Sequence, residues 1–203
     1  MAGPTAVWRQ RQQGFAARAA WMVLAAIGAA GVAGVVFAAQ FPLPDKSEVA
    51  FISTQIGAPV EGSFTRFSGR VDLDPKAPQA GSVTFTVDMA SVQFPSAEVL
   101  AELAKADWFD TAHFPKAEFR SSAIRTLGPG RFEVAGALTI KGRTRPVVIP
   151  VELQSTAGTS VATGLLAIKR LDFGIGGGEW GDTSVVEDEV KIRFKITLAP
   201  AAG

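Results

Sequence analysis

Apolar and polar residues alternate one by one along several segments of the chain, and this period of two constrains the fold more than any other feature. In the clearest case every second residue from Val190 to Leu198 is apolar, and the residues between them are Lys, Arg, Lys and Thr. Such alternation is typical of a half-buried β-strand. The same alternation recurs along the chain and predicts about eight strands, at 49–53, 67–73, 83–89, 119–123, 132–140, 147–153, 161–168 and 190–198. It is least regular at 161–168.

One segment breaks this pattern. Between Ser96 and Ala106, Val99, Leu100 and Leu103 fall at helical spacing, and Ser96 is a good N-cap, so we expect one short helix of about three turns. About eight strands without a strand–helix repeat predict an all-β fold, an antiparallel barrel or sandwich. Eight strands is also the size at which a barrel holds one small ligand.

The N-terminal 41 residues have a different composition. Arg9, Arg11 and Arg18 precede a run from Trp21 to Ala39 without any charge, which is close to the roughly 20 residues that a membrane-spanning helix needs. Cations before the run place the N-terminus in the cytoplasm and the main domain in the periplasm. A cleaved signal peptide is the alternative, which would leave a soluble periplasmic barrel. We therefore expect a cytoplasmic basic segment at 1–20, a transmembrane anchor or signal peptide at 21–41, a linker at 42–47 and a barrel at 48–203.

Composition excludes several functions. The net charge of +1 lacks the excess of cations that a nucleic-acid-binding protein needs. The chain has no Cys and a single His, His113, so disulfides, thiolate metal sites and histidine-rich metal sites are excluded. No catalytic constellation can be read around His113, and we expect neither a cofactor nor an enzyme. The chain has 14 Phe and 4 Trp but no Tyr, and rings without a hydroxyl suit a site that contacts hydrocarbon.

The candidate ligand-binding residues are aromatic side chains on the predicted inner faces and in two loops, although each could instead be core packing. On the strands they are Phe51, Phe67, Phe85, Phe119, Phe132 and Phe194, and in the loops Trp108, Phe109, Phe114, Phe173 and Trp180. Several loop aromatics stand beside charged residues or Gly, where they are suited to closing the mouth of a tunnel. Basic residues at one turn would either contact anionic lipid headgroups or form an ordinary solvated turn, and these are Lys141, Arg143 and Arg145.

The chain resembles the YceI-like family over residues 48–198. The resemblance rests on ordered motifs that include GSFTRFSGRVDLDP at 62–75, LAKADWFDTAHFPKAEFRSSAI at 103–124 and GALTIKGRTRPVVIPVEL at 136–153. It implies a lipocalin-like, extended eight-stranded antiparallel barrel with an apolar tunnel. The implied ligand is a polyisoprenoid, such as the tail of ubiquinone, held for storage, transport or presentation at the periplasmic face of the membrane.

Two segments depart from the usual form of the family. The usual opening strand is replaced by PLPDKSEVAFIST at 42–54. The segment DFGIGGGEW at 172–180 is similar to the form of the domain that accompanies b-type cytochromes, which implies a cytochrome as a possible partner. The alternative function is therefore an accessory interaction module of a membrane cytochrome, without a ligand of its own.

Overall fold

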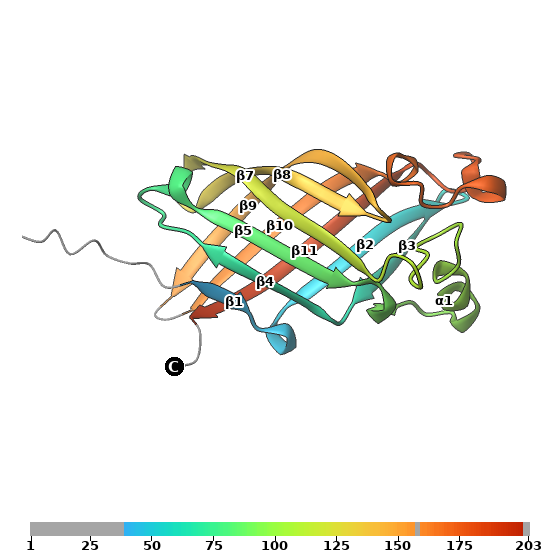
Figure 1. Cartoon of the computed structure of the whole chain (residues 1–203), viewed down its shortest axis with the longest axis horizontal. Helices are drawn as coiled ribbons and strands as arrows, with labels where there is room; N and C mark the ends of the chain where they lie inside the picture. The colour runs from blue at the N-terminus through green and yellow to red at the C-terminus, as the bar shows by residue number, and fades with distance from the viewer. Residues whose placement is uncertain (1–38, 157–158, 201–203) are drawn as a thin grey trace, which may run out of the picture. The chain divides into compact units, whose positions relative to one another are not determined.

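The computed structural model describes residues 39–156 and 159–200 and contains one β-sheet (Figure 1). The helices in this part of the chain are α1 (Ala97–Leu103) and the 3-10 turns η1 (Pro44–Lys46), η2 (Pro78–Ala80), η3 (Met89–Ser91), η4 (Arg170–Phe173) and η5 (Gly178–Gly181). The strands are β1 (Gln40–Pro42), β2 (Glu48–Gln55), β3 (Ala58–Phe64), β4 (Phe67–Asp72), β5 (Ser82–Asp88), β6 (Val92–Gln93), β7 (Lys116–Gly128), β8 (Arg131–Ile140), β9 (Arg143–Thr156), β10 (Thr159–Lys169) and β11 (Glu189–Pro200).

The strands form a closed antiparallel barrel. Strands β4, β5, β7, β8, β9, β10 and β11 follow one another around the wall, and β1 closes the ring by pairing with both β11 and β4. Beside them β2 pairs with β11, β3 with β2, and β6 with β3. The pairs β1/β2, β3/β4 and β5/β6 thus each make one interrupted strand, and the barrel has the eight strands that the sequence predicts.

The two ends of the barrel differ (Figure 1). One end, here called the loop end, carries α1, the segments 104–115 and 170–188, and the β2–β3 and β8–β9 turns. The other, here called the terminal end, carries β1 and the last residues of β11.

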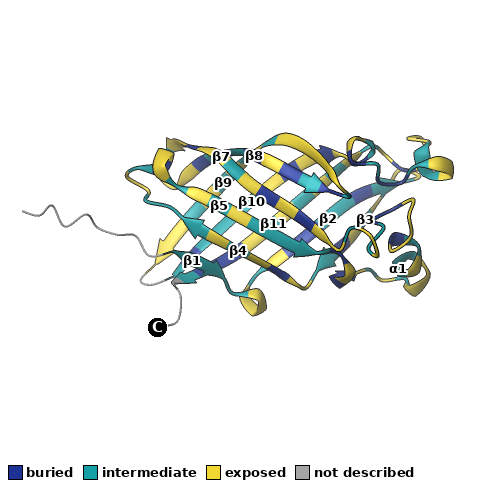
Figure 2. Cartoon of the chain, viewed as in Figure 1, coloured by how far each residue is buried: buried dark blue, intermediate teal, exposed yellow. Residues whose placement is uncertain are grey.

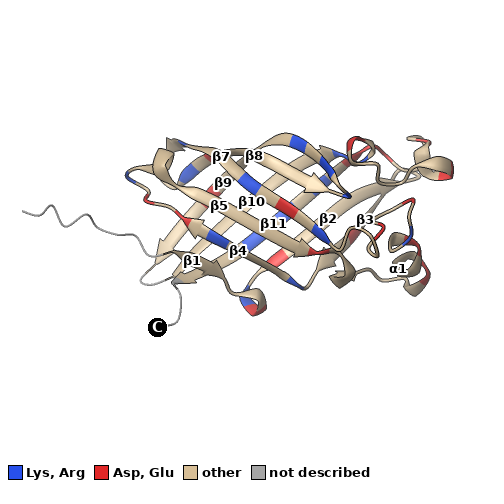
Figure 3. Ribbon diagram, viewed as in Figure 1, with Lys and Arg blue, Asp and Glu red and all other residues tan. Residues whose placement is uncertain are grey.

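Less and more exposed residues alternate along the strands (Figure 2), and charged residues occur at intervals along the strands and in the loops (Figure 3). The predicted alternation of β11 is confirmed at Ile196 and Leu198, which are buried, but Thr197 is buried as well. Its hydroxyl donates to the Lys46 carbonyl and its N–H donates to Ser47 Oγ. The turn η1 therefore covers this stretch of the outer wall, which the alternation of β11 alone does not reveal.

Three other expectations need correction. The predicted face of Phe119, Ser121 and Ala123 is wrong beyond Ser121, because a bulge in β7 shifts the register and turns Ile124 inward, with 2% of its surface exposed. The helix α1 is shorter than three turns, although Ser96 caps it as predicted and accepts from the Val99 N–H.

The third correction concerns the start of the barrel, which begins at Gln40 rather than at residue 48. Gln40 and Phe41, predicted as the end of the membrane span, pair in β1 with Pro200 and Ala199 of β11. The predicted linker at 42–47 holds the end of β1 and the turn η1. Residues 1–38, with the basic segment and most of the predicted span, lie outside the described residues. Within the described ranges no helix has the length and apolar character needed to cross a membrane.

Candidate functional site

The barrel encloses an apolar cavity, here called the lumen, of about 270 Å³. Only three of its lining residues are polar, namely Ser53, Glu118 and Arg170. Every barrel strand contributes to the wall, because the inward residues of each alternate with outward ones. The walls therefore offer a ligand shape and hydrocarbon contact, with almost no polar recognition along their length.

The structure brings most of the predicted aromatic residues to this lumen. Seven of the eleven line it: Phe51, Phe85, Trp108, Phe109, Phe119, Phe132 and Phe194. Phe67 instead belongs to a separate buried cluster and stacks on Phe85 with the ring centroids 5.6 Å apart. Phe64, in the unpredicted strand β3, also lines the lumen, and the alternating Val60, Gly62 and Phe64 were the signal that could have found it.

Three loop aromatics lie outside the lumen. Phe173 is buried in the core, with 2% of its surface exposed. Phe114 packs on the β8–β9 turn at Gly142. Trp180 packs against Trp108 with the ring centroids 5.6 Å apart. Phe173 and Trp180 thus pack behind the residues at the loop end of the lumen and do not line it.

Four of the lumen phenylalanines lie across glycines of the neighbouring strand. Phe51, Phe85 and Phe194 stand directly opposite Gly62, Gly69 and Gly164, and Phe119 lies diagonal to Gly136. A Cβ added at any of these glycines would lie closer than 3.0 Å to the phenylalanine ring. Each ring can therefore lie flat against the wall where the neighbouring strand has no side chain. The glycines keep the rings out of the centre, and in this way they preserve the lumen.

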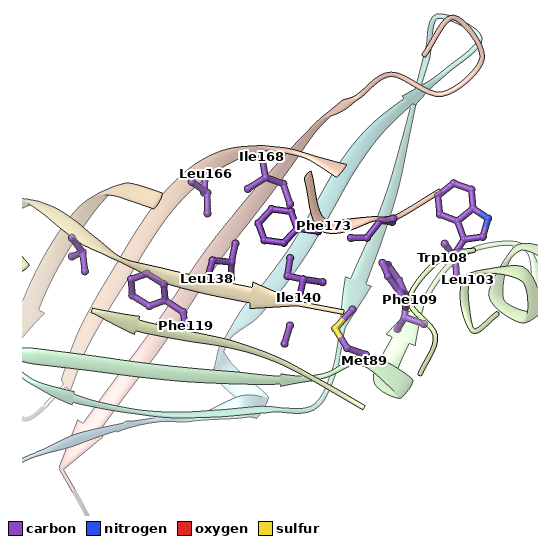
Figure 4. Close-up of a cluster of buried hydrophobic side chains, with 14 of the residues drawn as sticks. Met89, Leu103, Trp108, Phe109, Phe119, Leu138, Ile140, Leu166, Ile168 and Phe173 are labelled. Carbon is purple, nitrogen blue, oxygen red and sulfur yellow. The ribbon is translucent and has the colours of Figure 1, made fainter. Parts of the chain in front are cut away.

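Toward the loop end the lumen narrows between aromatic side chains. Phe51, Phe64 and Phe109 form a triangle with ring centroids 5.7 to 6.3 Å apart. Figure 4 shows Phe109 near Met89 and Trp108 farther out, beside Leu103 of α1. The indole N–H of Trp108 is buried and has no hydrogen-bond partner among the described residues. In Figure 4 this nitrogen is turned away from the barrel side chains, so the group that faces the lumen is hydrocarbon.

Beyond these rings the segments 104–115 and 170–188 form a cap, and its central side chain is Arg170. The residue has 1% of its surface exposed. It donates to five backbone carbonyls, those of Ile175, Gly176, Trp180, Val186 and Glu187. Burial lowers the pKa of Arg170, and Asp188 opposes that shift. Sequence reasoning missed this residue, because an Arg between Lys169 and Leu171 reads as an ordinary surface residue.

A second cation joins the two halves of the cap. Lys141 Nζ donates to the Ala106 carbonyl and to the Gly174 carbonyl at 2.7 Å. The Gly176 N–H donates to the Asp107 carbonyl, also at 2.7 Å. Burial lowers the pKa of Lys141, although Asp110 and Asp107 raise it. Lys141 thus holds segment 104–115 against segment 170–188.

The single histidine of the chain, His113, lies at the surface of segment 104–115. The His113 ring lies 2.8 Å from an Asp110 carboxylate oxygen, but its side chain is exposed and does not line the lumen. Among residues 39–156 and 159–200, no group of three or more His, Cys, Asp or Glu side chains could hold a metal ion. What the described arrangement can do chemically is hold an apolar molecule.

Comparisons with known proteins agree with this geometry. A family model described as the YceI-like domain matches residues 43–198. A UPF0312 protein of Vibrio cholerae is 31% identical over 183 residues, which cover 84% of this chain and 96% of that protein. The crystal structure of Burkholderia cenocepacia BcnA is 40% identical and covers 77% of this chain and 98% of its own, with a TM-score of 0.75.

A more distant structure shares the fold. The polyisoprenoid binding domain from Saccharophagus degradans is 16% identical and has a TM-score of 0.64, and the match covers 80% of this chain and 98% of that domain.

Proposed function

The chain belongs to the YceI-like family, and on that premise we propose that its barrel binds a polyisoprenoid chain in the lumen. The observation that carries the proposal is the cavity inside the barrel with its almost wholly apolar lining. A prenyl tail offers only methyl and alkene groups, so it needs contact area and shape rather than hydrogen bonds. The structurally similar domain of Saccharophagus degradans, described as polyisoprenoid binding, supports this class of ligand.

The energetics suit such a ligand. Burial of roughly 500 Å² of tail at about 25 cal/mol per Å² contributes on the order of 12 kcal/mol. The cost of association is about 4–15 kcal/mol, so micromolar to nanomolar binding needs no charged contact. We further propose that the ligand is the tail of a ubiquinone-like quinone, held for storage, transport or presentation.

We place this activity at the periplasmic face of the inner membrane. The support is the uncharged run from Trp21 to Ala39 behind Arg9, Arg11 and Arg18. An alkaline phosphatase fused after Gly203 should be active in cells, since this enzyme folds only after export. An inactive fusion at normal expression level would refute the periplasmic placement but would leave lipid binding untouched.

Lipid binding itself is tested by mass spectrometry of an organic extract from the full-length protein, purified from its native membrane. We expect one stoichiometric prenyl or quinone species. The second measurement is Trp fluorescence of a Trp8→Phe/Trp21→Phe variant, in which the two remaining tryptophans are Trp108 and Trp180. A long-tailed ubiquinone should quench this emission saturably, the tailless headgroup should not, and a polyprenol should compete.

An empty extract together with unsaturable quenching would overturn the proposal. The alternative, an accessory module of a b-type cytochrome, would then gain support. That alternative favours a barrel filled by its own side chains, and the lumen of about 270 Å³ argues for the ligand-binding function instead.

A further inference from the structure

Strands β9 and β10 are paired over only part of their lengths. Their ladder begins at Thr156 and Thr159 and ends at Val151 and Gly164. Beyond that point the described register pairs residues 143–150 of β9 with β8 alone, and residues 165–169 of β10 with β11 alone. Between these two stretches the wall therefore has no described backbone pairing. This unpaired stretch, here called the slit, runs from the Val151–Gly164 pair to the loop end.

The slit ends at the cap. There the guanidinium of Arg143 packs against Gly174, and Lys141 Nζ donates to the Gly174 carbonyl at 2.7 Å. The slit is thus bounded at one end by a backbone ladder and at the other by side-chain contacts.

Two prolines stand along the β9 edge of the slit. The Leu153 N–H donates to the Gly130 carbonyl on the β8 side. Because the N–H direction alternates along a strand, the backbone nitrogens of Pro146, Val148 and Pro150 face the slit. Proline has no N–H, so two of these three positions offer no donor to another strand. The edge is thereby protected against addition of a strand, as exposed edges usually are.

Apolar side chains line the slit on both faces of the wall. On the inside, Ile149, Leu166 and Ile168 are part of the lumen. On the outside, Val148 and Leu165 are 52% and 48% exposed, and they are among the most exposed large apolar residues described. An apolar molecule would therefore meet hydrocarbon on either face of the wall.

An outer hollow of about 650 Å³ lies at the foot of the slit. Its lining includes Pro150, Gly164 and Leu165, and it shares Phe132, Val151 and Phe194 with the lumen. The hollow and the lumen thus lie on opposite sides of one strip of wall. In that strip Gly164 has no side chain, and only the ring of Phe194 covers its inner side.

The loop end offers a harder route. A molecule entering along the barrel axis there would have to displace Trp108 and disrupt the hydrogen bonds of Arg170 and Lys141. Parting the slit breaks no rung of the backbone ladder between β9 and β10.

We propose that the slit between β9 and β10 is a lateral entrance through which an apolar chain passes from outside the barrel into the lumen. This inference rests on the proposed function, because it requires that the lumen holds such a chain. It concerns the route alone, so it predicts changes in the rates of uptake and release with an unchanged equilibrium affinity.

The test is a reversible bridge across the slit. Continuing the β9–β10 register would bring Val148 opposite Ala167, and the chain has no native Cys. A Val148→Cys/Ala167→Cys variant, in the Trp8→Phe/Trp21→Phe background, is joined by a bifunctional thiol reagent that contains a reducible bond. The probe is a long-tailed ubiquinone, and stopped-flow quenching of Trp108 and Trp180 reports its uptake. We expect the bridge to slow uptake and release at least tenfold, and reduction to restore both rates.

The matched control bridges the paired part of the same two strands. Gln154 and Val161 are register partners on the same outer face as Val148 and Ala167, so a Gln154→Cys/Val161→Cys bridge leaves the slit free and should leave both rates unchanged. A single Val148→Cys variant labelled with a bulky maleimide tests the same prediction, because it does not require two thiols at a distance that the reagent can bridge. It should also slow uptake.

The outcomes separate the two proposals. Unchanged rates with the slit bridged and with the bulky label would overturn the lateral entrance and assign uptake to an end of the barrel. Failure of the unbridged protein to bind the quinone would instead overturn the proposed function, and the entrance with it.

Discussion

The wall of the lumen and the cap at the loop end are held together by different interactions. The wall is held by backbone ladders, and it turns alternating apolar side chains inward around a space that it leaves open. The cap has little regular structure, and the cations of Arg170 and Lys141 hold it by donating to backbone carbonyls. A wall can thus be specified by a repeating pattern, whereas a cap depends on a few individual residues.

The largest expected effect follows from the cap. Replacement Arg170→Met removes a charged donor from five carbonyls, three of them in buried hydrogen bonds. We expect it to lower the free energy of unfolding by about 4 kcal/mol, measured by urea denaturation. Arg125→Met is the matched control, since the Arg125 side chain is 76% exposed, and it should change stability by less than about 0.5 kcal/mol. A loss below about 1 kcal/mol for Arg170→Met would show that the cap is held in some other way.

The glycine–phenylalanine pairs test the wall. A Cβ at Gly62 would meet the Phe51 ring, so Gly62→Ala should push that ring into the lumen, cost about 1–3 kcal/mol of stability and weaken binding of long-tailed quinones. In a Phe51→Leu background the same change should cost about 1 kcal/mol less, because the ring is gone. Gly181→Ala, with open space around it, is the neutral control. Equal costs in both backgrounds would contradict the role given to the glycine.

A smaller effect is expected at Lys141. Lys141→Met removes two hydrogen bonds between the halves of the cap and should cost about 1–2 kcal/mol near neutral pH. Burial lowers the pKa of Lys141 below its usual value of 10.5, so the unfolded chain holds this proton more tightly. The stability of the wild type relative to Lys141→Met should therefore rise with pH, between the folded pKa and 10.5. Urea titrations across that window measure the difference, and a fall would contradict the assigned burial.

The smallest effect is expected for Trp108→Phe. Its indole N–H is buried without a described partner, so Trp108→Phe removes an unsatisfied donor together with part of a ring. These two effects oppose each other, and the net change should stay within about 1 kcal/mol. Trp108→Ala, which leaves a cavity, should cost about 3–5 kcal/mol. If Trp108→Phe were as costly as Trp108→Ala, the N–H would have to be satisfied in solution.

The same contrast explains what could be predicted. Alternation in 67–73, 83–89 and 190–198 identified strands and their inner faces, because a wall repeats its pattern at every strand. It failed at Ile124, since a bulge leaves no mark in the polarity of the neighbouring residues. It also failed at Arg170, whose burial depends on carbonyls that lie 5 to 17 residues away in sequence. Two prolines in β9 did mark an incompletely paired edge, and that signal was present in the sequence.

The closure of the ring by β11 determines when this chain can fold. Strand β11 pairs with β1, β2 and β10, yet it is synthesised after all three of them. Until residues 189–200 have been made, β2 and β10 each lack a neighbouring strand, and the apolar side chains of the lumen are exposed to water. A nascent or truncated chain is therefore prone to aggregate. The long sequence separation between β1 and β11 makes this pairing slow to form, so the barrel stays open until β11 has been made and has paired.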